Sequence, residues 1–489
     1  MLSKNNISNI GLVIGLIVFL FFLLSKPPKE LSYYGWLTAG IALLMTIWWI
    51  SEAVPIYATG LVPLVMFPIF GLYDLKVISS SYAHPLVLLF LGGFIIASAM
   101  ESSGLHKRIA LKILHLAGTS PSKIIAGFMI TTALLSMWVS NTASTIMMLP
   151  IALSVISIFN TKHNNKKNDF AIPLLLAIAY SASIGGTATL IGTPTNIMLA
   201  SILSDTYNYQ ISFIDWFIIG FPITLVLLPI VWIFLNKIIF QVSSKNSNAL
   251  EKTLVNLNKN IGKASVNEKV VAMIFILTAS LWIFRKILNE SLGFSLNDTS
   301  IGILGALMLF IIPIGKGKRA CNWDTANKIP WGVLFLVGGG IALSKAFKLS
   351  GLADWIGSFS YYLNGLDIYL LILISVFVII FLTELNSNTA TVATFTPILI
   401  VFAVELNSNP LFFVIPTTIA ASCAFMLPIA TPPNAVIFGS GKIDIKEMIK
   451  AGIGLNLVSV IIVVVLSTII LNSIFGYNVM NVPAWVLNN

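Results

Sequence analysis

The sequence predicts an all-α membrane protein that crosses the bilayer many times. Of its 489 residues, 57% are hydrophobic and only 9% are charged, whereas soluble domains carry about 25% charged residues. Many apolar segments approach the ~20 residues of a membrane-spanning helix, so helices rather than barrel strands are expected. A Ser-Asn-Thr-Ala motif occurs at position 140 and again at position 387, each time followed by Pro-Ile at the same spacing. We therefore expect about eleven transmembrane helices and two re-entrant hairpins in an inverted-topology repeat.

Charge and cysteine content exclude several other classes of protein. The formal net charge is +10, but the lysines cluster in short loops between apolar segments, which indicates membrane topology rather than nucleic-acid binding. Only Cys321 and Cys423 are present, too few for a disulfide framework or a cysteine-based metal site. The apolar segment 7–24 lacks a small-residue cleavage site, so we expect a retained first helix with a cytoplasmic N-terminus rather than a signal peptide.

Three further spans are expected at 36–50, 55–72 and 85–100, and a hairpin follows them. Two apolar arms, each shorter than a full span, flank Ser140-Asn141-Thr142 within segment 124–159, and lysines lie on both sides of this segment. Positive charge on both flanks places both ends in the cytoplasm. We therefore expect a re-entrant hairpin that enters from the cytoplasm and carries the polar triplet at its buried tip.

The next segment, 170–203, is expected to be a broken helix. It contains Gly185-Gly186-Thr187 and Gly192-Thr193-Pro194-Thr195-Asn196, and glycine and proline this dense interrupt a helix. The two half-helices would expose free amides, carbonyls and helix ends to a solute at mid-membrane. A span at 217–240 then returns the chain to the cytoplasm, where a polar linker at 241–268 separates the two halves.

The second half repeats this order. Its hairpin, 368–404, carries Ser387-Asn388-Thr389 at the tip and lacks basic flanks, so it enters from outside. The two tips then meet near the membrane midplane. A second broken helix begins at 411–427 and continues through Ala430-Thr431-Pro432-Pro433-Asn434. The remaining spans are expected at 270–288, 301–314, 331–343 and 453–474, with an external C-terminus.

The repeated residues predict a polar site without a fixed charge. The three arginines, Arg108, Arg285 and Arg319, lie at segment ends, so an anion bound between the triplets would lack a protein counter-ion. Hydroxyl, amide and carbonyl oxygens are ligands that alkali cations accept, and a bound cation would supply the missing positive charge. Moving a dianion inward against ~100 mV costs about 4.6 kcal/mol, which two Na⁺ ions cancel and a third would reverse. The pattern favours Na⁺-coupled anion uptake.

Other interpretations of these residues stay open at this stage. Serine, threonine and asparagine in membrane helices often only form hydrogen bonds between helices, although two motif copies, each followed by Thr-Pro-x-Asn, favour a site. Glu384 could carry a proton, but its repeat counterpart is Met137, and we favour a structural hydrogen-bonding role. An intramembrane hydrolase could use Ser140 or Ser387 as its nucleophile, but neither has a histidine or lysine base nearby.

The paired Ser-Asn-Thr triplets, the Thr-Pro-x-Asn links and the segment Ser51-Glu52-Ala53-Val54-Pro55 resemble the divalent anion/sodium symporter family, often called the INDY group. The resemblance covers essentially the whole chain. It implies a homodimer in which a mobile transport domain moves against a scaffold domain by an elevator motion. By this resemblance, residues 1–121 and 269–365 form the scaffold domain, residues 122–240 and 366–489 form the transport domain, and 241–268 is the cytoplasmic linker.

The resemblance also implies which residues form the site. One Na⁺ would be bound by Ser136, Ser140, Asn141 and a carbonyl near Gly192, and a second by Thr383, Ser387, Asn388 and a carbonyl near Ala430. The substrate carboxylates would be held by Asn141, Thr142, Asn388 and Thr389, with Thr193, Thr431 and Pro432 alongside. At position 386 the chain has Asn, where some relatives have a small apolar residue.

By the same resemblance, the protein is expected to be a Na⁺-coupled importer of C4-dicarboxylates such as succinate, malate or fumarate in the cell membrane. The intact second triplet, and Ser144 instead of an arginine after the first triplet, favour symport over dicarboxylate exchange. Sulfate or a tricarboxylate such as citrate stays open as the substrate, because the sequence does not fix the distance between the two clamps.

Overall fold

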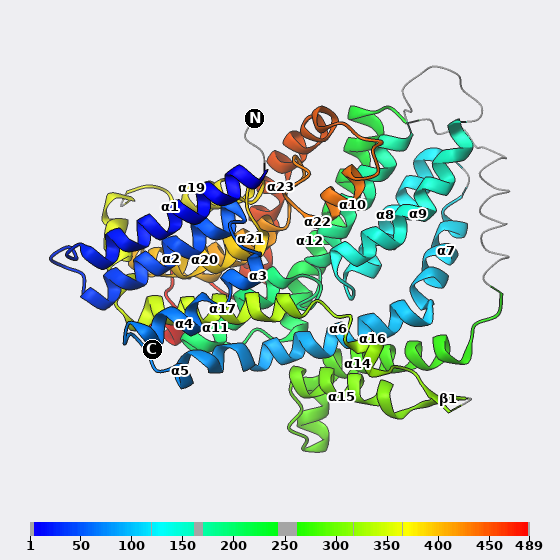
Figure 1. The fold of residues 1–489 in the computed structure, drawn as a ribbon. Helices are drawn as coiled ribbons and strands as arrows, with labels where there is room; N and C mark the ends of the chain where they lie inside the picture. The colour runs from blue at the N-terminus through cyan, green and yellow to red at the C-terminus, as the bar shows by residue number, and fades with distance from the viewer. Residues whose placement is uncertain are drawn as a thin grey trace.

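The computed structural model describes residues 4–118, 120–160, 170–242, 262–315, 317–363 and 365–487, and it is almost entirely helical (Figure 1). In this part of the chain, eight helices are long and apolar enough to cross a membrane, and seven shorter apolar helices accompany them. The predicted polytopic helical fold is therefore confirmed, while the number of spans stays a prediction. Most of the predicted linker, 243–261, lies outside the described residues.

The first helices follow the predicted spans with one exception. α1 (Lys4–Leu24) and α2 (Tyr33–Ser51) pack against each other. The predicted continuous span 55–72 is wrong, because α3 (Ile56–Thr59) and α4 (Val62–Ile69) replace it. The break lies at Gly60 and Leu61, and Pro63, in the first turn of α4, has no N–H to donate to the Thr59 carbonyl. The chain continues through α5 (Leu75–Ser79), η1 (Ser80–Ala83), α6 (Pro85–Ser103) and α7 (Leu105–Ala117).

A pair of helices lies at the first predicted hairpin and another at the first predicted broken helix, while the re-entrant path of the hairpin stays a prediction. α8 (Pro121–Ser136) and α9 (Asn141–Asn160) are joined by a short tip. α10 (Ala171–Gly186) and α11 (Pro194–Tyr207) are separated by a link of turns at residues 187–193. Pro194 opens α11, because a residue without an N–H suits the first position of a helix. α12 (Phe213–Ile233) follows and continues into a π-helical turn, η2 (Phe234–Ile239).

The second half contains the same pair of devices. α19 (Ile368–Thr383) and α20 (Asn388–Glu405) form the second hairpin, and α21 (Leu411–Ala421) and α22 (Pro432–Phe438) form the second broken helix. The remaining helices of this half are α14 (Val266–Leu292), α15 (Asp298–Ile311), α16 (Trp323–Ala326), α17 (Trp331–Leu349), α18 (Leu352–Ser358), η3 (Phe359–Leu363), α23 (Ile445–Ser473) and α24 (Ala484–Leu487).

One small element departs from the all-α prediction. β1 (Pro313–Gly315) pairs antiparallel with β2 (Lys318–Arg319) at the end of the predicted span 301–314, where no strand was expected. The tight reversal uses left-handed backbone conformations at Gly315 (φ +93°) and Gly317 (φ +69°), which residues with a Cβ rarely adopt. The strands are too short to have left a hydrophobic pattern in the sequence.

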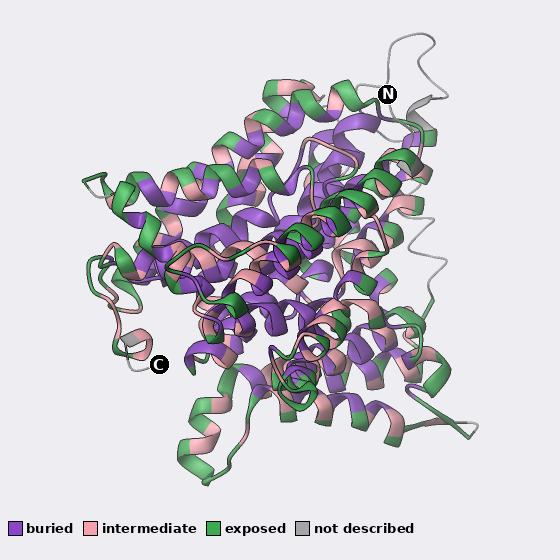
Figure 2. Ribbon diagram, turned by 60° about the vertical axis from the view of Figure 1, so that its left-hand side comes forward, coloured by how far each residue is buried: buried purple, intermediate pink, exposed green. Residues whose placement is uncertain are grey.

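The two halves interlock at the centre of the molecule. α10 packs against α8 and α9 of its own half and against α22 of the other half, and α11 packs against α20 and α21. Every residue of α10 and of α21 is buried, and Figure 2 shows the buried residues concentrated along the inner helices. The broken helices therefore form the core of the fold and contact both hairpins.

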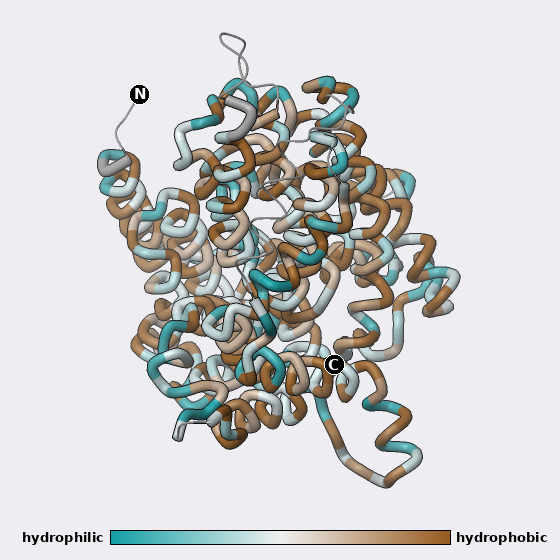
Figure 3. The backbone as a smooth tube through the Cα atoms, turned by 90° about the vertical axis from the view of Figure 1, so that its right-hand side faces the viewer, coloured by the Kyte–Doolittle hydropathy of each residue, from teal (hydrophilic) through white to brown (hydrophobic). Residues whose placement is uncertain are grey.

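The outer helices expose apolar side chains. Val13 in α1, Ile276 in α14 and Ile461 in α23 are 52%, 62% and 59% exposed. Hydrophobic residues recur along the outer helices in Figure 3. An apolar surface this extensive suits contact with lipid rather than with water.

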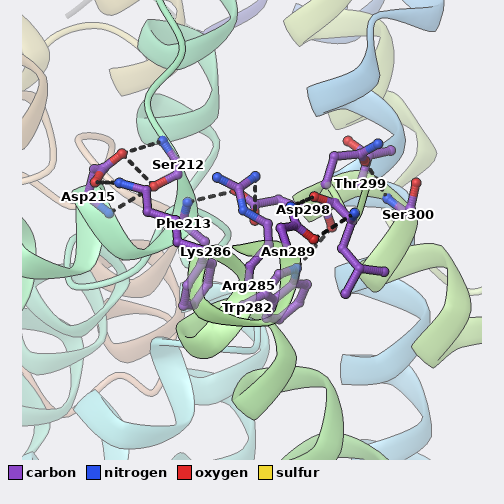
Figure 4. Close-up of polar contacts among 12 residues, drawn as sticks. Ser212, Phe213, Asp215, Trp282, Arg285, Lys286, Asn289, Asp298, Thr299 and Ser300 are labelled. Atoms are coloured by element: carbon purple, nitrogen blue, oxygen red, sulfur yellow. Dashed lines mark hydrogen bonds and ion pairs between the residues drawn. The ribbon is translucent and has the colours of Figure 1, made fainter. Parts of the chain in front are cut away.

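A charged cluster joins the start of α12 to α14 and α15 (Figure 4). The Phe213 N–H donates to Asp298 Oδ2 at 2.8 Å, and Arg285 forms an ion pair with Asp298 at 3.1 Å. Lys286 forms an ion pair with Asp215, also at 3.1 Å. These contacts connect the chain segment predicted as transport domain to the segment predicted as scaffold domain.

Candidate functional site

Both Ser-Asn-Thr triplets and both broken-helix links line the same cavity, which has a volume of about 1380 Å³. Ser136 and Thr383 are fully buried and lie behind its wall, each in contact with a triplet asparagine. The structure therefore brings the predicted residues of both halves together. Those that line the cavity are Ser140, Asn141, Thr142, Gly192, Thr193, Ser387, Asn388, Thr389, Ala430, Thr431 and Pro432.

Three oxygen atoms converge behind the first triplet. Ser136 Oγ lies 2.7 Å from Asn141 Oδ1 and 2.7 Å from the carbonyl oxygen of Ala182. A hydroxyl has one proton, so Ser136 can donate to only one of these two acceptors at a time. An oxygen cluster with too few protons suits a cation that takes hard oxygen ligands, such as Na⁺.

The second half contains the same arrangement. Thr383 Oγ1 lies 2.6 Å from Asn388 Oδ1 and 3.0 Å from the carbonyl oxygen of Ala421. The hydroxyl residue precedes the asparagine by five positions in both halves. The Ala182 and Ala421 carbonyls could not be predicted from the sequence, because a contact made by the backbone of an alanine leaves no signal in its side chain.

The asparagines of the Thr-Pro-x-Asn links hold the broken helices open. Asn196 Nδ2 donates to the carbonyls of Gly186 at 3.1 Å and Thr189 at 2.8 Å. Asn434 Nδ2 donates to those of Ala424 at 3.2 Å and Leu427 at 3.0 Å. A helix that stops leaves carbonyls without their N–H partners, and these amides replace the lost donors. Sequence reasoning predicted the links but missed this structural role of their asparagines.

The links also present two helix starts to the cavity. Thr193 and Thr431 are extended residues that precede Pro194 and Pro432, the first residues of α11 and α22. The N–H groups in the first turn of α11 attract negative charge. α22 differs, because Pro432 and Pro433 have no N–H and the Asn434 N–H already donates to Thr431 Oγ1 at 3.2 Å. Gly192 allows the first link to fold back on itself, because a Cβ there would lie 2.4 Å from the Gly186 carbonyl oxygen.

Charged side chains reach the cavity away from the triplets. Besides the buried His106, the acidic and basic side chains among the described residues that line it are Glu52, Glu101, Lys107 and Lys328. Glu52 and Glu101 lie at the ends of α2 and α6, respectively. Lys107 lies near the start of α7, and Lys328 lies just before α17. All four are exposed, so the cavity extends from the uncharged triplets to an open mouth of mixed charge.

The chain matches the model of a known protein family. The model describes the transmembrane region of sodium:sulfate symporters and matches residues 6–475. The chain belongs to the sodium:sulfate symporter family. The resemblance to the divalent anion/sodium symporters that the repeated motifs indicated is therefore confirmed over almost the whole chain.

Relatives within this symporter family are closely similar to the chain. The sodium-dependent dicarboxylate transporter SdcS of Staphylococcus saprophyticus is 40% identical over 480 residues, which cover 96% of this chain and 92% of the relative. The transporter of the same name from Staphylococcus aureus is 41% identical with the same coverage. Both relatives are named as transporters rather than enzymes.

Two solved structures share the fold. MtrF of Neisseria gonorrhoeae, described as illuminating a class of antimetabolite efflux pumps, aligns with a TM-score of 0.59 and 12% identity over 96% of this chain and 95% of its own. The YdaH transporter of Alcanivorax borkumensis aligns with a TM-score of 0.56 and 14% identity over 91% and 99%. At these identities the likeness concerns the fold alone.

Glu384 lies outside the cavity of this symporter and is only 3% exposed. Its carboxylate accepts hydrogen bonds from the Met426 N–H at 2.9 Å, the Leu427 N–H at 3.0 Å and Asn456 Nδ2 at 2.7 Å. All three partners donate, which suits an ionised carboxylate that only accepts. These bonds tie the end of α19 to the second link and to α23, as the favoured structural role requires.

Proposed function

We propose that this protein imports C4-dicarboxylates such as succinate, malate or fumarate into the cell, coupled to Na⁺. The observation that carries the proposal is the pair of uncharged Ser-Asn-Thr tips that line the same cavity. A dianion between them has no charged protein partner there, and an unpaired charge is costly away from water. Cations must therefore bind with the anion. The relatives named sodium-dependent dicarboxylate transporters support this assignment.

Each half supplies one carboxylate clamp. Asn141 and Thr142, with Thr193 alongside, hold one carboxylate, and Asn388 and Thr389 hold the other, with Thr431 and Pro432 alongside. Amide and hydroxyl donors form short, strong hydrogen bonds to an ionised carboxylate. Two equivalent clamps fit a substrate that carries one carboxylate at each end.

The cations bind beside the clamps. One Na⁺ takes Ser136, Ser140, Asn141 and the Gly192 carbonyl as ligands, and a second takes Thr383, Ser387, Asn388 and the Ala430 carbonyl. Asn141 Oδ1 is turned toward the Ser136 hydroxyl, which leaves Asn141 Nδ2 for the substrate. Asn388 is arranged in the same way toward Thr383. One amide thus contacts the cation and the anion, which couples the binding of the two.

The charge of the substrate determines how many Na⁺ ions must accompany it to offset the electrical cost of import. Moving each negative charge into the cell against 100 mV costs about 2.3 kcal/mol, and the inward movement of each Na⁺ releases the same free energy. Two Na⁺ ions make the import of a dianion electrically neutral. A third ion would let the membrane potential drive uptake.

The proposed movement is that of an elevator within a homodimer. The first arms of the two hairpins, α8 and α19, have 16 residues each, about 24 Å at 1.5 Å per residue, which is shorter than the ~30 Å hydrocarbon core. The second arms, α9 and α20, have 20 and 18 residues, so the support for re-entrant hairpins comes from the first arms. Residues 122–240 and 366–489 form the moving transport domain, and residues 1–121 and 269–365 form the scaffold domain. With the N-terminus in the cytoplasm and the C-terminus outside, the mouth at Lys107 and Lys328 faces the cytoplasm.

The alternatives fit less well. Sulfate, which the family description names, has its charge on one centre and cannot engage two separate clamps at once. A tricarboxylate would leave a third carboxylate without a clamp of its own, and a dicarboxylate exchanger would not need the two oxygen clusters. The family relationship leaves no support for a hydrolase that uses Ser140 or Ser387.

Uptake into proteoliposomes tests the proposal. Purified protein should accumulate labelled succinate when an inward Na⁺ gradient is imposed, and replacing Na⁺ with choline should abolish accumulation. Excess malate or fumarate should compete with succinate, and excess sulfate should not. Equal accumulation in choline would refute Na⁺ coupling, and competition by sulfate alone would refute the dicarboxylate assignment.

A further inference from the structure

Asn386 is a polar residue of the cavity that the first half does not match. It directly precedes Ser387 and lines the cavity. The residue at the same place in the first half is Val139, which directly precedes Ser140, also lines the cavity and is 3% exposed. The second tip therefore presents an amide where the first presents an apolar side chain. The two ends of the substrate site are chemically different at this position.

The orientation of the Asn386 amide follows from one hydrogen bond. Its Oδ1 accepts from the Ser387 N–H at 2.8 Å. An amide that accepts through its oxygen turns its two Nδ2 protons the other way. No acceptor for these protons is found among the described residues. Since Asn386 is part of the cavity wall, Nδ2 is a free donor for a bound solute.

A symmetric dicarboxylate does not need this donor. Under the proposed function, on which this inference rests, each carboxylate already has an asparagine, a threonine and a neighbouring cation. These groups are the same in both halves. The Asn386 amide is a donor that only the second half has. It suits a substrate that differs from succinate at one end, by an oxygen atom on the carbon next to one carboxylate.

We propose that Asn386 is a specificity-determining residue that donates a hydrogen bond from Nδ2 to the hydroxyl oxygen of 2-hydroxydicarboxylates. The carboxylate next to that hydroxyl lies in the Asn388 and Thr389 clamp, and the other carboxylate lies in the Asn141 and Thr142 clamp. A hydroxyl oxygen accepts this bond without any change in the charge balance of transport. Malate therefore binds more tightly than it would without the hydrogen bond from Asn386.

Competition measurements on Asn386→Val test this inference, because valine is the residue that the first half has at this place. Na⁺-driven uptake of labelled succinate is measured against increasing malate, and against methylsuccinate, which carries a methyl group in place of the hydroxyl. One neutral hydrogen bond corresponds to a roughly 3- to 10-fold change in affinity. The inhibition constant of malate should rise by this factor. The succinate KM, the methylsuccinate inhibition constant and the Na⁺ half-saturation should each stay within about twofold.

Two further variants keep the experiment decisive. Leu385→Ala changes a neighbouring cavity residue that has no side-chain donor and should leave the malate-to-succinate ratio unchanged. Asn386→Ala removes the same donor and replaces Asn386→Val if the latter does not fold. An unchanged malate constant would overturn the inference. Equal weakening of malate and succinate, or a raised Na⁺ half-saturation, would also overturn it, because Asn386 would then act through the clamp or the cation site. Absence of Na⁺-dependent uptake by the wild-type protein would instead refute the proposed function itself.

Discussion

The two hairpin tips carry the same ligand groups but are held in place by different contacts. Both end in Ser-Asn-Thr, and in both a buried hydroxyl meets the triplet asparagine and a backbone carbonyl. The three residues before the triplet differ completely: Met137-Trp138-Val139 in the first half and Glu384-Leu385-Asn386 in the second. The repeat is therefore kept in the triplets and in the buried hydroxyl groups behind them, and it is lost in the three residues before each triplet.

The supporting contacts of the two tips show how far they have diverged. In the first half, the Thr189 hydroxyl donates to the Met137 carbonyl, and Trp138 stacks with Phe213 and Trp282 at ring-centroid distances of 5.8 and 6.5 Å. In the second half, the Glu384 carboxylate accepts from the link, and Leu385 is 62% exposed. The first tip is thus docked against α14, whereas the second is fixed mainly from within its own half.

The largest effects should come from the shared residues and should be alike in the two halves. Under the proposed function, Asn141→Ala and Asn388→Ala each remove a cation ligand and a carboxylate donor. Contacts to charged groups are worth about 1.5–3 kcal/mol each, so losing two should lower kcat/KM for succinate by roughly 100-fold or more. The measurement is the initial rate of uptake at varied succinate and Na⁺ concentrations.

The matched control for these variants is Asn481→Ala, which removes an exposed amide near the end of the described chain. It should transport like the wild-type protein. If only one of the two triplet variants lost activity, the two tips would not form equivalent halves of one site.

A large and one-sided effect is expected at Glu384. Glu384→Ala leaves the Met426 and Leu427 N–H groups and the Asn456 amide without their acceptor, and each such loss costs about 1–3 kcal/mol. The free energy of unfolding should therefore fall by roughly 3 kcal/mol or more, measured as loss of thermal stability of the purified protein. Glu405→Ala, an exposed acid at the end of α20, should have little effect.

Glu384→Gln separates the structural role from proton carriage. Glutamine keeps one acceptor oxygen, so a folded variant should retain Na⁺-driven uptake with the pH dependence of the wild-type protein. Loss of that pH dependence in a stable variant would show that Glu384 carries a proton and is more than a support.

A smaller loss of stability is expected when Trp138 is replaced by alanine, and a smaller one still for Leu385, which occupies the same place in the second repeat. Aromatic pairs are worth about 0.5–1.5 kcal/mol each, so Trp138→Ala should destabilise the protein by roughly 2 kcal/mol. Leu385→Ala changes an exposed side chain and should cost less than about 0.5 kcal/mol. Thermal stability followed by size-exclusion chromatography gives both values. Equal losses would mean that the stacking against Trp282 does not fix the first tip.

The same comparison explains what could be predicted from the sequence. Hydropathy locates most spans because lipid demands continuous apolar helices, and it fails at 55–72, where the helix breaks at Gly60 and Leu61 within sequence that stays apolar. The triplets could be predicted to form a site, because a polar motif that occurs twice within apolar sequence is rare. The Ala182 and Ala421 carbonyls, the amides of Asn196 and Asn434, and the Trp138 stack depend on contacts between distant segments, so local pattern could not predict them.

The last pair of variants tests each of the two proposed carboxylate clamps separately. Thr142→Ala and Thr389→Ala should each remove one hydroxyl donor to a carboxylate while the cation ligands remain. A single hydrogen bond to a charged group, at about 1.5 kcal/mol, corresponds to a roughly tenfold rise in the succinate KM. Thr142→Ser and Thr389→Ser keep the hydroxyl and should restore nearly the wild-type KM. A KM that responds to one threonine but not to the other would show that the substrate is held at one tip only, and that the two clamps differ as much as their supports do.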